Sequence, residues 1–342
     1  MACKVSRQEG GGDTMNRTAT ILGGFAMAAA LSLSIAAQAL ELKMLSSWTP
    51  NNKSSWGTEQ MFMTMVAEES KGRLTIKRSG PETVPPFEQL QPVGAGVFDI
   101  LLTHGAYHAG TTAIGLALDG IAGDPVKRRD VGIWDFAAKH YQKSDLTTLA
   151  FLPQGTSGYH MILREPVGAD GGLKGRKVRG TAGYHPLIKG LGGSPVVLAP
   201  TDIYTALEKG VVDGVAFPTV GIVDMKWSEV AKFYLQPSFG ISTLQLFMNT
   251  NSFNKLSPED KKVLLDVGRK IEQNVWKDFD KMAVEEIDLM QKAGMKETRL
   301  SKENEAQMGK LFAEGIWDLA VSKNKAEAEE FRKLVTDKGM GL

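Results

Sequence analysis

The sequence predicts an α/β protein, and three observations support this fold class. From residue 42 to residue 103, short apolar strands alternate with amphipathic helices, which is typical of a parallel sheet with helices on its faces. The same alternation returns between residues 173 and 218. A helical pattern then extends from 258 to 294, and at 1.5 Å per residue it would be about 50 Å long. Such a helix must either bend or run along two lobes.

The N-terminal segment has the features of a secretory signal peptide. Arg17 provides a basic flank, residues 21–35 form a short apolar run, and small residues precede a cleavage point after Ala39. Met15 begins a complete signal by itself, so residues 1–14 are interpreted as an upstream extension. A retained N-terminal anchor is the alternative. We expect residues 1–39 to be absent from the mature protein, which would reside in the periplasm.

Composition excludes several classes of function. The single cysteine, Cys3, belongs to the predicted signal segment, so neither a disulfide framework nor a cysteine nucleophile is expected in the mature chain. With 40 Lys and Arg against 39 Asp and Glu, the formal net charge is +1. Because there is no basic excess, nucleic acid and anionic membrane surfaces are not expected partners.

The first half of the chain supplies the elements of one lobe. We expect strands at 42–45, 74–77 and 100–103, and helices at 58–69 and 87–93. A weak internal echo links 88–99 with 204–213, because in each segment a helix ends at glycine and Val-x-Asp opens a strand. This repetition fits two lobes of similar construction, each supplying one wall of a cleft.

The segment from 173 to 218 carries the most informative residue. It is predicted to form strand, loop, helix, strand, helix and strand, and Arg179 stands at the carboxyl end of its first strand. Val178 precedes this arginine, and Gly180 breaks the strand after it. Ligands in open α/β sheets bind at that end of the strands, and a guanidinium binds carboxylate bidentately. The alternative is an arginine paired with a surface carboxylate; its position favours an anionic ligand.

Aromatic side chains follow several of the predicted strands. For each of them alone, core packing is as good an explanation as ligand contact. Their convergence on strand ends favours an apolar, aromatic pocket. The candidates are Trp48, Tyr107, Tyr159, Tyr184 and Phe217.

Three stretches resemble catalytic or cofactor motifs but are incomplete. Residues 155–159 approach the G-x-S-x-G elbow of hydrolases, with Tyr159 in place of the last glycine. His104 and His108 have the spacing of a zinc helix, but Gly105 stands where the metalloprotease base belongs. A dinucleotide loop beginning at Gly94 fails for lack of its third glycine. We expect no enzyme activity, no cofactor and no metal.

Several motifs together resemble the solute-binding proteins of tripartite ATP-independent periplasmic (TRAP) transporters, the dicarboxylate-receptor (DctP-like) family. The matching segments are 71–74, 96–99, 173–179, 191–196, 204–214, 227–232, 248–249 and 256–260. The resemblance implies a two-lobed periplasmic binding protein (type II-like) with a long helix bridging both lobes. It also implies a receptor that closes over an organic acid and delivers it to a membrane permease.

The resemblance assigns lobes and contacts to this chain. Residues 40–154 plus 243–283 would form lobe 1, and residues 155–242 plus 284–342 would form lobe 2. Arg179 matches the family's carboxylate anchor. Further contacts are implied at Phe217, at the loop holding Thr103, His104 and Tyr107, and at the loop holding Ser47 and Trp48.

Two departures from the family pattern bear on the ligand. Ser157 stands where sugar-acid receptors often place a second arginine, and the Trp and Glu of cation-dependent 2-oxo acid receptors are missing around Phe217. One arginine among aromatics suits a monocarboxylate with an aromatic or hydroxylated body. His104, Tyr107 or Glu82 would form a hydrogen bond with a hydroxyl of the ligand.

Two other functions remain open: a ligand sensor with the same site, and a periplasmic hydrolase. We expect a monomer that contacts its small-molecule ligand and the permease subunits.

Overall fold

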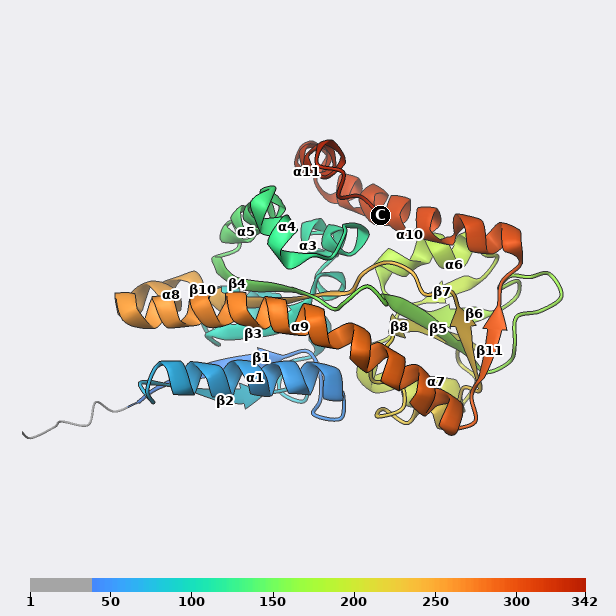
Figure 1. The fold of residues 1–342 in the computed structure, drawn as a ribbon, viewed down its shortest axis with the longest axis horizontal. Helices are drawn as coiled ribbons and strands as arrows, with labels where there is room; N and C mark the ends of the chain where they lie inside the picture. The colour runs from blue at the N-terminus through green and yellow to red at the C-terminus, as the bar shows by residue number, and fades with distance from the viewer. Residues whose placement is uncertain (1–38) are drawn as a thin grey trace, which may run out of the picture. The chain divides into compact units, whose positions relative to one another are not determined.

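Two β-sheets form the framework of the part of the chain that the structure describes (Figure 1). The structure is a computed structural model, and it describes residues 39–342. The predicted signal peptide therefore falls outside the described residues. None of the helices between residues 39 and 342 is long and apolar enough to cross a membrane.

The first sheet is mixed rather than purely parallel. Its strand order is β2-β1-β3-β10-β4. Strands β1, β2 and β3 run parallel, whereas β10 is antiparallel to both of its neighbours. The expectation of a parallel sheet is corrected here, because β10 enters the sheet only after the chain has passed through the second sheet and returned. The strands are β1 (Leu40–Ser46), β2 (Leu74–Ser79), β3 (Ile100–His104), β4 (Leu146–Pro153) and β10 (Thr243–Asn249).

Short helices surround this sheet, and the first helix begins earlier than the sequence predicts. Helix α1 (Lys53–Glu69) starts directly after Asn52, whose side-chain oxygen accepts a hydrogen bond from the backbone N–H of Ser55 at 3.2 Å. Asparagine is a favoured residue at this position because it pairs one of the free N–H groups of the first turn. The other elements are η1 (Pro86–Glu88), α2 (Leu90–Gly94), η2 (Gly105–Tyr107), α3 (Ile114–Ala117), η3 (Leu118–Gly120), α4 (Pro125–Asp130) and α5 (Ile133–Gln142).

The second sheet has the order β11-β9-β5-β8-β6-β7. Its parallel pair β6 and β8 aligns Arg179 with Val215, so Phe217 lies on the strand next to Arg179. The strands are β5 (Tyr159–Leu163), β6 (Lys177–Arg179), β7 (Ser194–Val196), β8 (Gly214–Pro218), β9 (Phe233–Gln236) and β11 (Lys296–Arg299). Their connections hold η4 (Ala182–Tyr184), α6 (His185–Gly190), η5 (Pro200–Asp202), α7 (Ile203–Glu208) and η6 (Trp227–Glu229).

One long helix, α9 (Pro258–Lys292), follows the short α8 (Thr250–Lys255) and runs along both sheets (Figure 1). Ser257 caps it by accepting from the backbone N–H of Asp260 at 3.1 Å. Two buried glutamates bind it to different parts of the molecule. Glu272 accepts from Arg129 at 2.7 and 2.8 Å, and Glu286 accepts from the backbone N–H of Val223 at 2.8 Å. The helix thus bridges both sheets.

Two segments cross between the sheets. One joins β4 to β5, and there the φ of Gly158 is +53°; a β-carbon at that position would collide with the backbone oxygen of Gly240 in the other segment. Asp280 of α9 holds the first segment by accepting from the backbone N–H groups of Thr156 and Ser157, at 2.6 and 3.1 Å. Both crossings are thus held by contacts of their own backbone.

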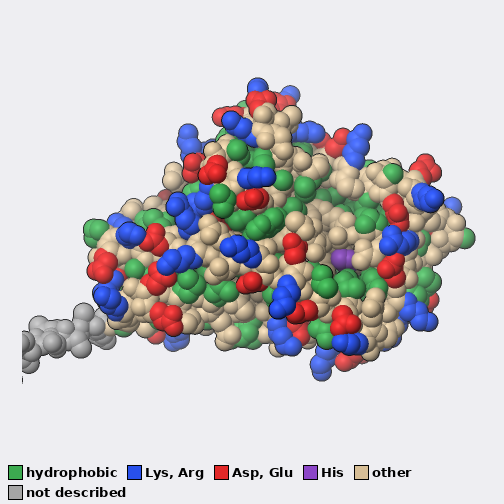
Figure 2. Space-filling view, viewed as in Figure 1, with side chains coloured by type: hydrophobic (Ala, Val, Ile, Leu, Met, Phe, Trp, Pro, Cys, Tyr) green, Lys and Arg blue, Asp and Glu red, His purple; other side chains and the backbone are tan. Residues whose placement is uncertain are grey.

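The last two helices join parts that are distant in sequence. Helix α10 (Lys302–Lys323) contacts both α6 of the second sheet and η3 of the first. Helix α11 (Lys325–Asp337) packs against α5, where the rings of Phe331 and Phe136 stack at 4.6 Å. Helix α11 belongs to the segment 284–342 that we assign to lobe 2, and it packs against α5, a helix beside the first sheet. Figure 2 shows cationic and anionic side chains mixed over this face of the molecule, as the near-zero net charge leads one to expect.

Candidate functional site

A narrow cavity lies between the two sheets, where several strands end. Strands β3, β6 and β8 end at His104, Arg179 and Pro218, and all three residues line it. Ligand sites in α/β proteins commonly lie at this end of the strands. The lining consists of Trp48, Asn52, Ser54, Ser55, His104, Ala106, Tyr107, Gln154, Tyr159, Arg179, Thr181, Tyr184, Phe217, Pro218 and Leu244.

Arg179 supplies the cationic end of this cavity although its side chain is 1% exposed. Its Nε and Nη2 groups donate to the carbonyl oxygen of Leu198 at 3.0 and 2.8 Å, and Nη1 donates to that of Ala216 at 3.2 Å. A guanidinium has five N–H donors, so two remain after these bonds. The carbonyls fix the plane of the fork, and the hydroxyl of Tyr107 lies close to it.

No carboxylate lies within ion-pairing distance of Arg179 in residues 39–342, and the ionisable groups acting on it are the hydroxyls of Tyr107 and Tyr184. Burial lowers the pKa of Arg179, and these hydroxyls oppose the shift. Arginine nonetheless stays charged at any physiological pH. The cavity lining contains neither Asp, Glu nor Lys. A buried charge without a counter-ion is costly, and an anionic ligand would offset that cost.

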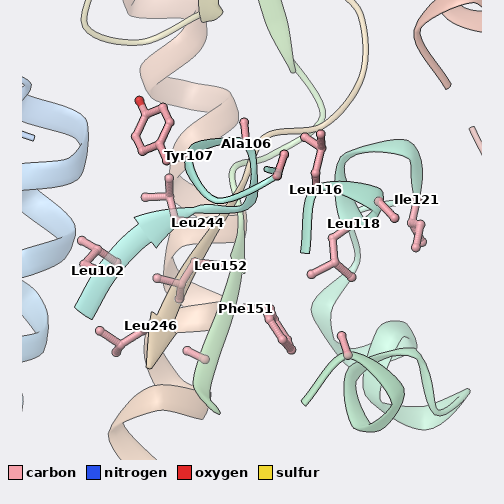
Figure 3. Close-up of a cluster of buried hydrophobic side chains, with 14 of the residues drawn as sticks. Leu102, Ala106, Tyr107, Leu116, Leu118, Ile121, Phe151, Leu152, Leu244 and Leu246 are labelled. Carbon is pink, nitrogen blue, oxygen red and sulfur yellow. The ribbon is translucent and has the colours of Figure 1, made fainter. Parts of the chain in front are cut away.

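Tyr107 faces this guanidinium from the first sheet. Burial raises the pKa of Tyr107 to about 12, while the nearby charge of Arg179 acts in the opposite direction. The phenol therefore stays protonated and can donate. Figure 3 shows Tyr107 at one end of an apolar cluster, with its hydroxyl directed away from Leu244 and Leu246.

His104, Tyr159 and Asp119 form a polar network behind the cavity. The Nδ1 atom of His104 accepts from the backbone N–H of Ala106 at 3.1 Å, so in the neutral ring the proton is on Nε2. That Nε2 lies 3.1 Å from Asp119 Oδ2, to which the hydroxyl of Tyr159 donates at 2.6 Å. Asp119 also accepts from the backbone N–H of Thr243 at 3.0 Å. The network ties the two sheets together and fixes the orientation of the His104 ring.

Aromatic rings form the apolar wall. The Arg179 guanidinium carbon lies 5.8 Å from the centre of the Phe217 ring. Trp48 and Tyr107 pack at 5.6 Å between ring centres, and Tyr159 packs edge-on against Tyr184 at 5.0 Å. These rings come from both sheets, so the apolar wall is complete only when the sheets are close together.

Seven of the eight ligand-binding residues expected from the sequence line this one cavity. Glu82 is not among the lining residues; its carboxylate accepts from the backbone N–H of Gly80 at 2.7 Å. The sequence analysis missed polar residues of the lining, chiefly Asn52, Ser54, Ser55, Gln154 and Thr181. Among them, only Asn52 could have been found from the sequence, because asparagine is a favoured helix cap and this cap follows the end of a strand near the site.

The motif-like stretches take other roles. The hydroxyl of Ser157 donates to Asp280 at 3.1 Å, which makes it part of the crossing segment. His108 points away from His104 and contacts the hydroxyl of Tyr141 at 2.6 Å. Burial lowers the pKa of His108 to about 3, so it is neutral at physiological pH. Neither residue forms a nucleophile–base pair or a shared metal site with its sequence neighbours.

Residues 45–321 match the family of bacterial extracellular solute-binding proteins, family 7 (DctP). The protein belongs to this family. Its members are the periplasmic solute-binding proteins of TRAP transporters, which are receptors rather than enzymes. The two-lobed fold and the long helix predicted by the resemblance are confirmed.

Known proteins of the family span nearly the same length. The 2,3-diketo-L-gulonate-binding periplasmic protein YiaO of Escherichia coli (strain K12) is 25% identical over 283 residues, covering 79% of this chain and 83% of YiaO. DctP7, a Bordetella pertussis receptor that binds pyroglutamic acid, superimposes with a TM-score of 0.77 at 19% identity, over 87% of this chain and 100% of that one.

A third similar protein binds aromatic acids. This TRAP solute-binding protein from an unidentified marine microbe was solved with metahydroxyphenylacetate; it is 21% identical, with a TM-score of 0.72 over 87% of this chain and 99% of that one. At this identity the likeness establishes the fold. The family is extracytoplasmic and implies a membrane permease as partner.

Proposed function

We propose that this protein captures an organic monocarboxylate with an aromatic or hydroxylated body by closure of its two lobes, and delivers it to a TRAP permease. The observation that carries the proposal is Arg179, a buried cation with no carboxylate partner in the described residues, at the end of an aromatic cavity.

Charge balance supports one carboxylate rather than two. The cavity lining contains a single arginine and no other cationic Lys or Arg side chain. One carboxylate neutralises it, whereas the second charge of a dicarboxylate would be buried without a cation. The Nε2 atom of His104 already faces the carboxylate of Asp119 at 3.1 Å.

The apolar wall supports an aromatic or otherwise flat body. Burial of apolar surface contributes roughly 25 cal/mol per Å², and ring–ring contacts with Phe217 and Tyr184 would add to it. A sugar acid carries a hydroxyl on almost every carbon and would leave several of them against these rings. The marine receptor that binds aromatic acids shows that the fold can accommodate such ligands.

A thermal-shift panel tests this proposal. The mature protein would be refolded to remove any co-purified ligand and then heated with benzoate, 3-hydroxyphenylacetate, D-glucuronate or malonate. A ligand at a hundred times its Kd stabilises by about 2.7 kcal/mol, which raises the Tm by several degrees. We expect this rise with the aromatic acids. A rise with malonate, and none with either aromatic acid, would contradict the proposal.

A further inference from the structure

We propose that the side-chain amides of Asn52 and Gln154 form a second subsite of the cavity, which binds an acceptor oxygen on the body of the ligand. The inference rests on the proposed function, since it concerns the same ligand. It narrows the ligand class to monocarboxylates that carry an additional oxygen acceptor, such as a hydroxyl or a carbonyl.

The first observation is the orientation of the Asn52 amide. Its oxygen accepts from the backbone N–H of Ser55 at 3.2 Å and from the hydroxyl of Ser54 at 2.8 Å. A backbone N–H can only donate, so the atom it contacts must be the oxygen. The NH₂ group is therefore on the other side, and it forms no hydrogen bond within residues 39–342, although the side chain is 3% exposed.

Gln154 repeats this arrangement on the segment that joins β4 to β5. One terminal atom of its amide lies 2.5 Å from the hydroxyl of Ser242, which can donate or accept, and the other terminal atom has no partner within the described residues. The residue is 2% exposed. Unlike the amide nitrogen of Gln245, which is fully enclosed, the nitrogens of Asn52 and Gln154 keep contact with open space. Both residues line the cavity, and Asn52 also lines a neighbouring hollow beside Tyr204 and Trp227.

Other buried amides of the protein show what a structural role looks like. Asn249 also caps a helix, α8, and its NH₂ group donates to the carbonyls of Val93 and Gly94 at 3.0 and 2.8 Å. Gln89 donates to the carbonyls of Ser46 and Val84 at 3.0 and 2.9 Å. Since buried amide donors are normally paired, two unpaired ones facing one cavity indicate a ligand that completes them.

The chemistry of this subsite defines what it accepts. The free NH₂ group of Asn52 can only donate, so it favours a ligand oxygen with free lone pairs, and Gln154 can turn its amide to present the same donor. Asn52 also stands at the N-terminus of the 17-residue helix α1, whose dipole favours partial negative charge. An amino group of the ligand would instead place its own N–H donors against the amide donors of the subsite. An aromatic methyl group would leave both amides desolvated and unpaired.

Isosteric ligands test the subsite directly. The probes are the three hydroxybenzoates, the three methylbenzoates and the three aminobenzoates, because the hydroxyl, methyl and amino groups are similar in size. Calorimetry would give the Kd of each with the wild type. We expect at least one hydroxybenzoate to bind about tenfold more tightly than the methyl and amino isomers with the same substitution pattern, the effect of one or two well-made hydrogen bonds.

The variants Asn52→Ser and Gln154→Leu assign that preference to these residues. Serine retains the helix cap while it removes the NH₂ donor, so Asn52→Ser should leave the fold intact. Asn324→Ser is the matched control: it changes a cap of the same type on α11, outside the cavity lining. We expect the preference for hydroxyl over methyl to fall to about threefold or less in either cavity variant, and to stay unchanged in the control.

The outcomes separate the subsite from the proposed function. If Arg179→Met abolishes binding of all benzoates while Asn52→Ser and Gln154→Leu keep the full hydroxyl preference, the subsite is refuted and the proposed function stands. A wild type that prefers the methyl or amino isomers also refutes the subsite. If neither the benzoates nor 3-hydroxyphenylacetate bind to the wild type, both fall.

Discussion

Two arginines of this protein are equally buried and differently partnered. Arg128 of α4 is 2% exposed and Arg179 of β6 is 1% exposed. Arg128 donates to the carbonyls of Leu118, Ala122 and Ile121 at 2.7–2.8 Å and to the hydroxyl of Thr243 at 3.1 Å. It lies in the field of the carboxylates of Asp119 and Glu272.

Arg179, by contrast, has two carbonyl partners and only tyrosine hydroxyls as ionisable neighbours. Burial lowers the pKa of both arginines, that of Arg128 to about 10, and in Arg128 the carboxylates oppose the shift. The difference shows that the charge of Arg128 is balanced by carboxylates of the protein, whereas the charge of Arg179 is balanced only when an anion binds from outside. Burial alone would not have separated the structural arginine from the functional one.

The largest expected effect is on stability, from Arg128→Met. This change leaves three carbonyls and the carboxylate of Asp119 without their buried cation. The free energy of unfolding in urea should fall by about 3–5 kcal/mol, the usual cost of removing one member of a buried charged network. A loss below about 1 kcal/mol would mean that Arg128 does not hold this part of the fold.

Arg179→Met should show the opposite pattern. Arg179 has no carboxylate partner that its removal would leave unpaired. The ligand-free Arg179→Met variant should therefore lose far less stability than the Arg128→Met variant. Affinity for the best-bound benzoate should fall by about 2–5 kcal/mol, or thirtyfold and more, as measured by calorimetry. Arg179→Lys is the control for charge without the planar fork, and should recover only part of the affinity. Equal loss of stability in both methionine variants would remove the distinction drawn here.

Tyr159→Phe probes the network behind the cavity. The phenylalanine keeps the ring contact with Tyr184 but removes the hydrogen bond to Asp119. Because hydrogen bonds to charged groups contribute about 1.5–3 kcal/mol, we expect a loss of that size in the free energy of unfolding. Unchanged stability would show that Asp119 is satisfied by His104 and Thr243 alone.

Acid should weaken the fold through two histidines that stay neutral when buried. Burial lowers the pKa of His108 to about 3 and that of His160 to about 4, from an ordinary value of 6.5. The unfolded chain takes up these protons near pH 6.5 and the folded protein does not, so stability is complete above pH 6.5 and is lost as pH falls towards 4. At pH 5.5 each histidine should cost about 1.4 kcal/mol relative to neutral pH.

Urea unfolding at pH 7.5 and 5.5 measures this loss, and His160→Gln should reduce it. If the free energy of unfolding falls by the same amount between pH 7.5 and pH 5.5 in the variant, His160 is not the group that titrates. A smaller loss in the variant would show that buried histidine stays neutral in this fold, whereas the buried arginines Arg128 and Arg179 stay charged.

Local sequence could predict the strand ends and their aromatic residues. Val178 and Gly180 showed that Arg179 ends a buried strand, and the periodicity of 258–294 predicted the bridging helix, α9. Position along the chain is enough for such predictions, since the carboxyl ends of parallel strands meet at one edge.

The remaining features depend on contacts between distant segments. The side chain of Gln154 contacts the hydroxyl of Ser242, 88 residues further along the chain, and no local spacing in the sequence shows this contact. The direction of β10 depends on the return of the chain from the second sheet. The docking of α11 on α5 depends on ring stacking across almost 200 residues, which local periodicity does not contain.

The most direct test of the account is a crystal structure of the refolded protein with the benzoate that binds most tightly. We expect the ligand carboxylate on the Arg179 guanidinium, with N···O distances of about 2.7–2.9 Å, and the ring between the aromatic side chains of the cavity. A carboxylate bound elsewhere, with the fork of Arg179 still paired only to Leu198 and Ala216, would contradict it.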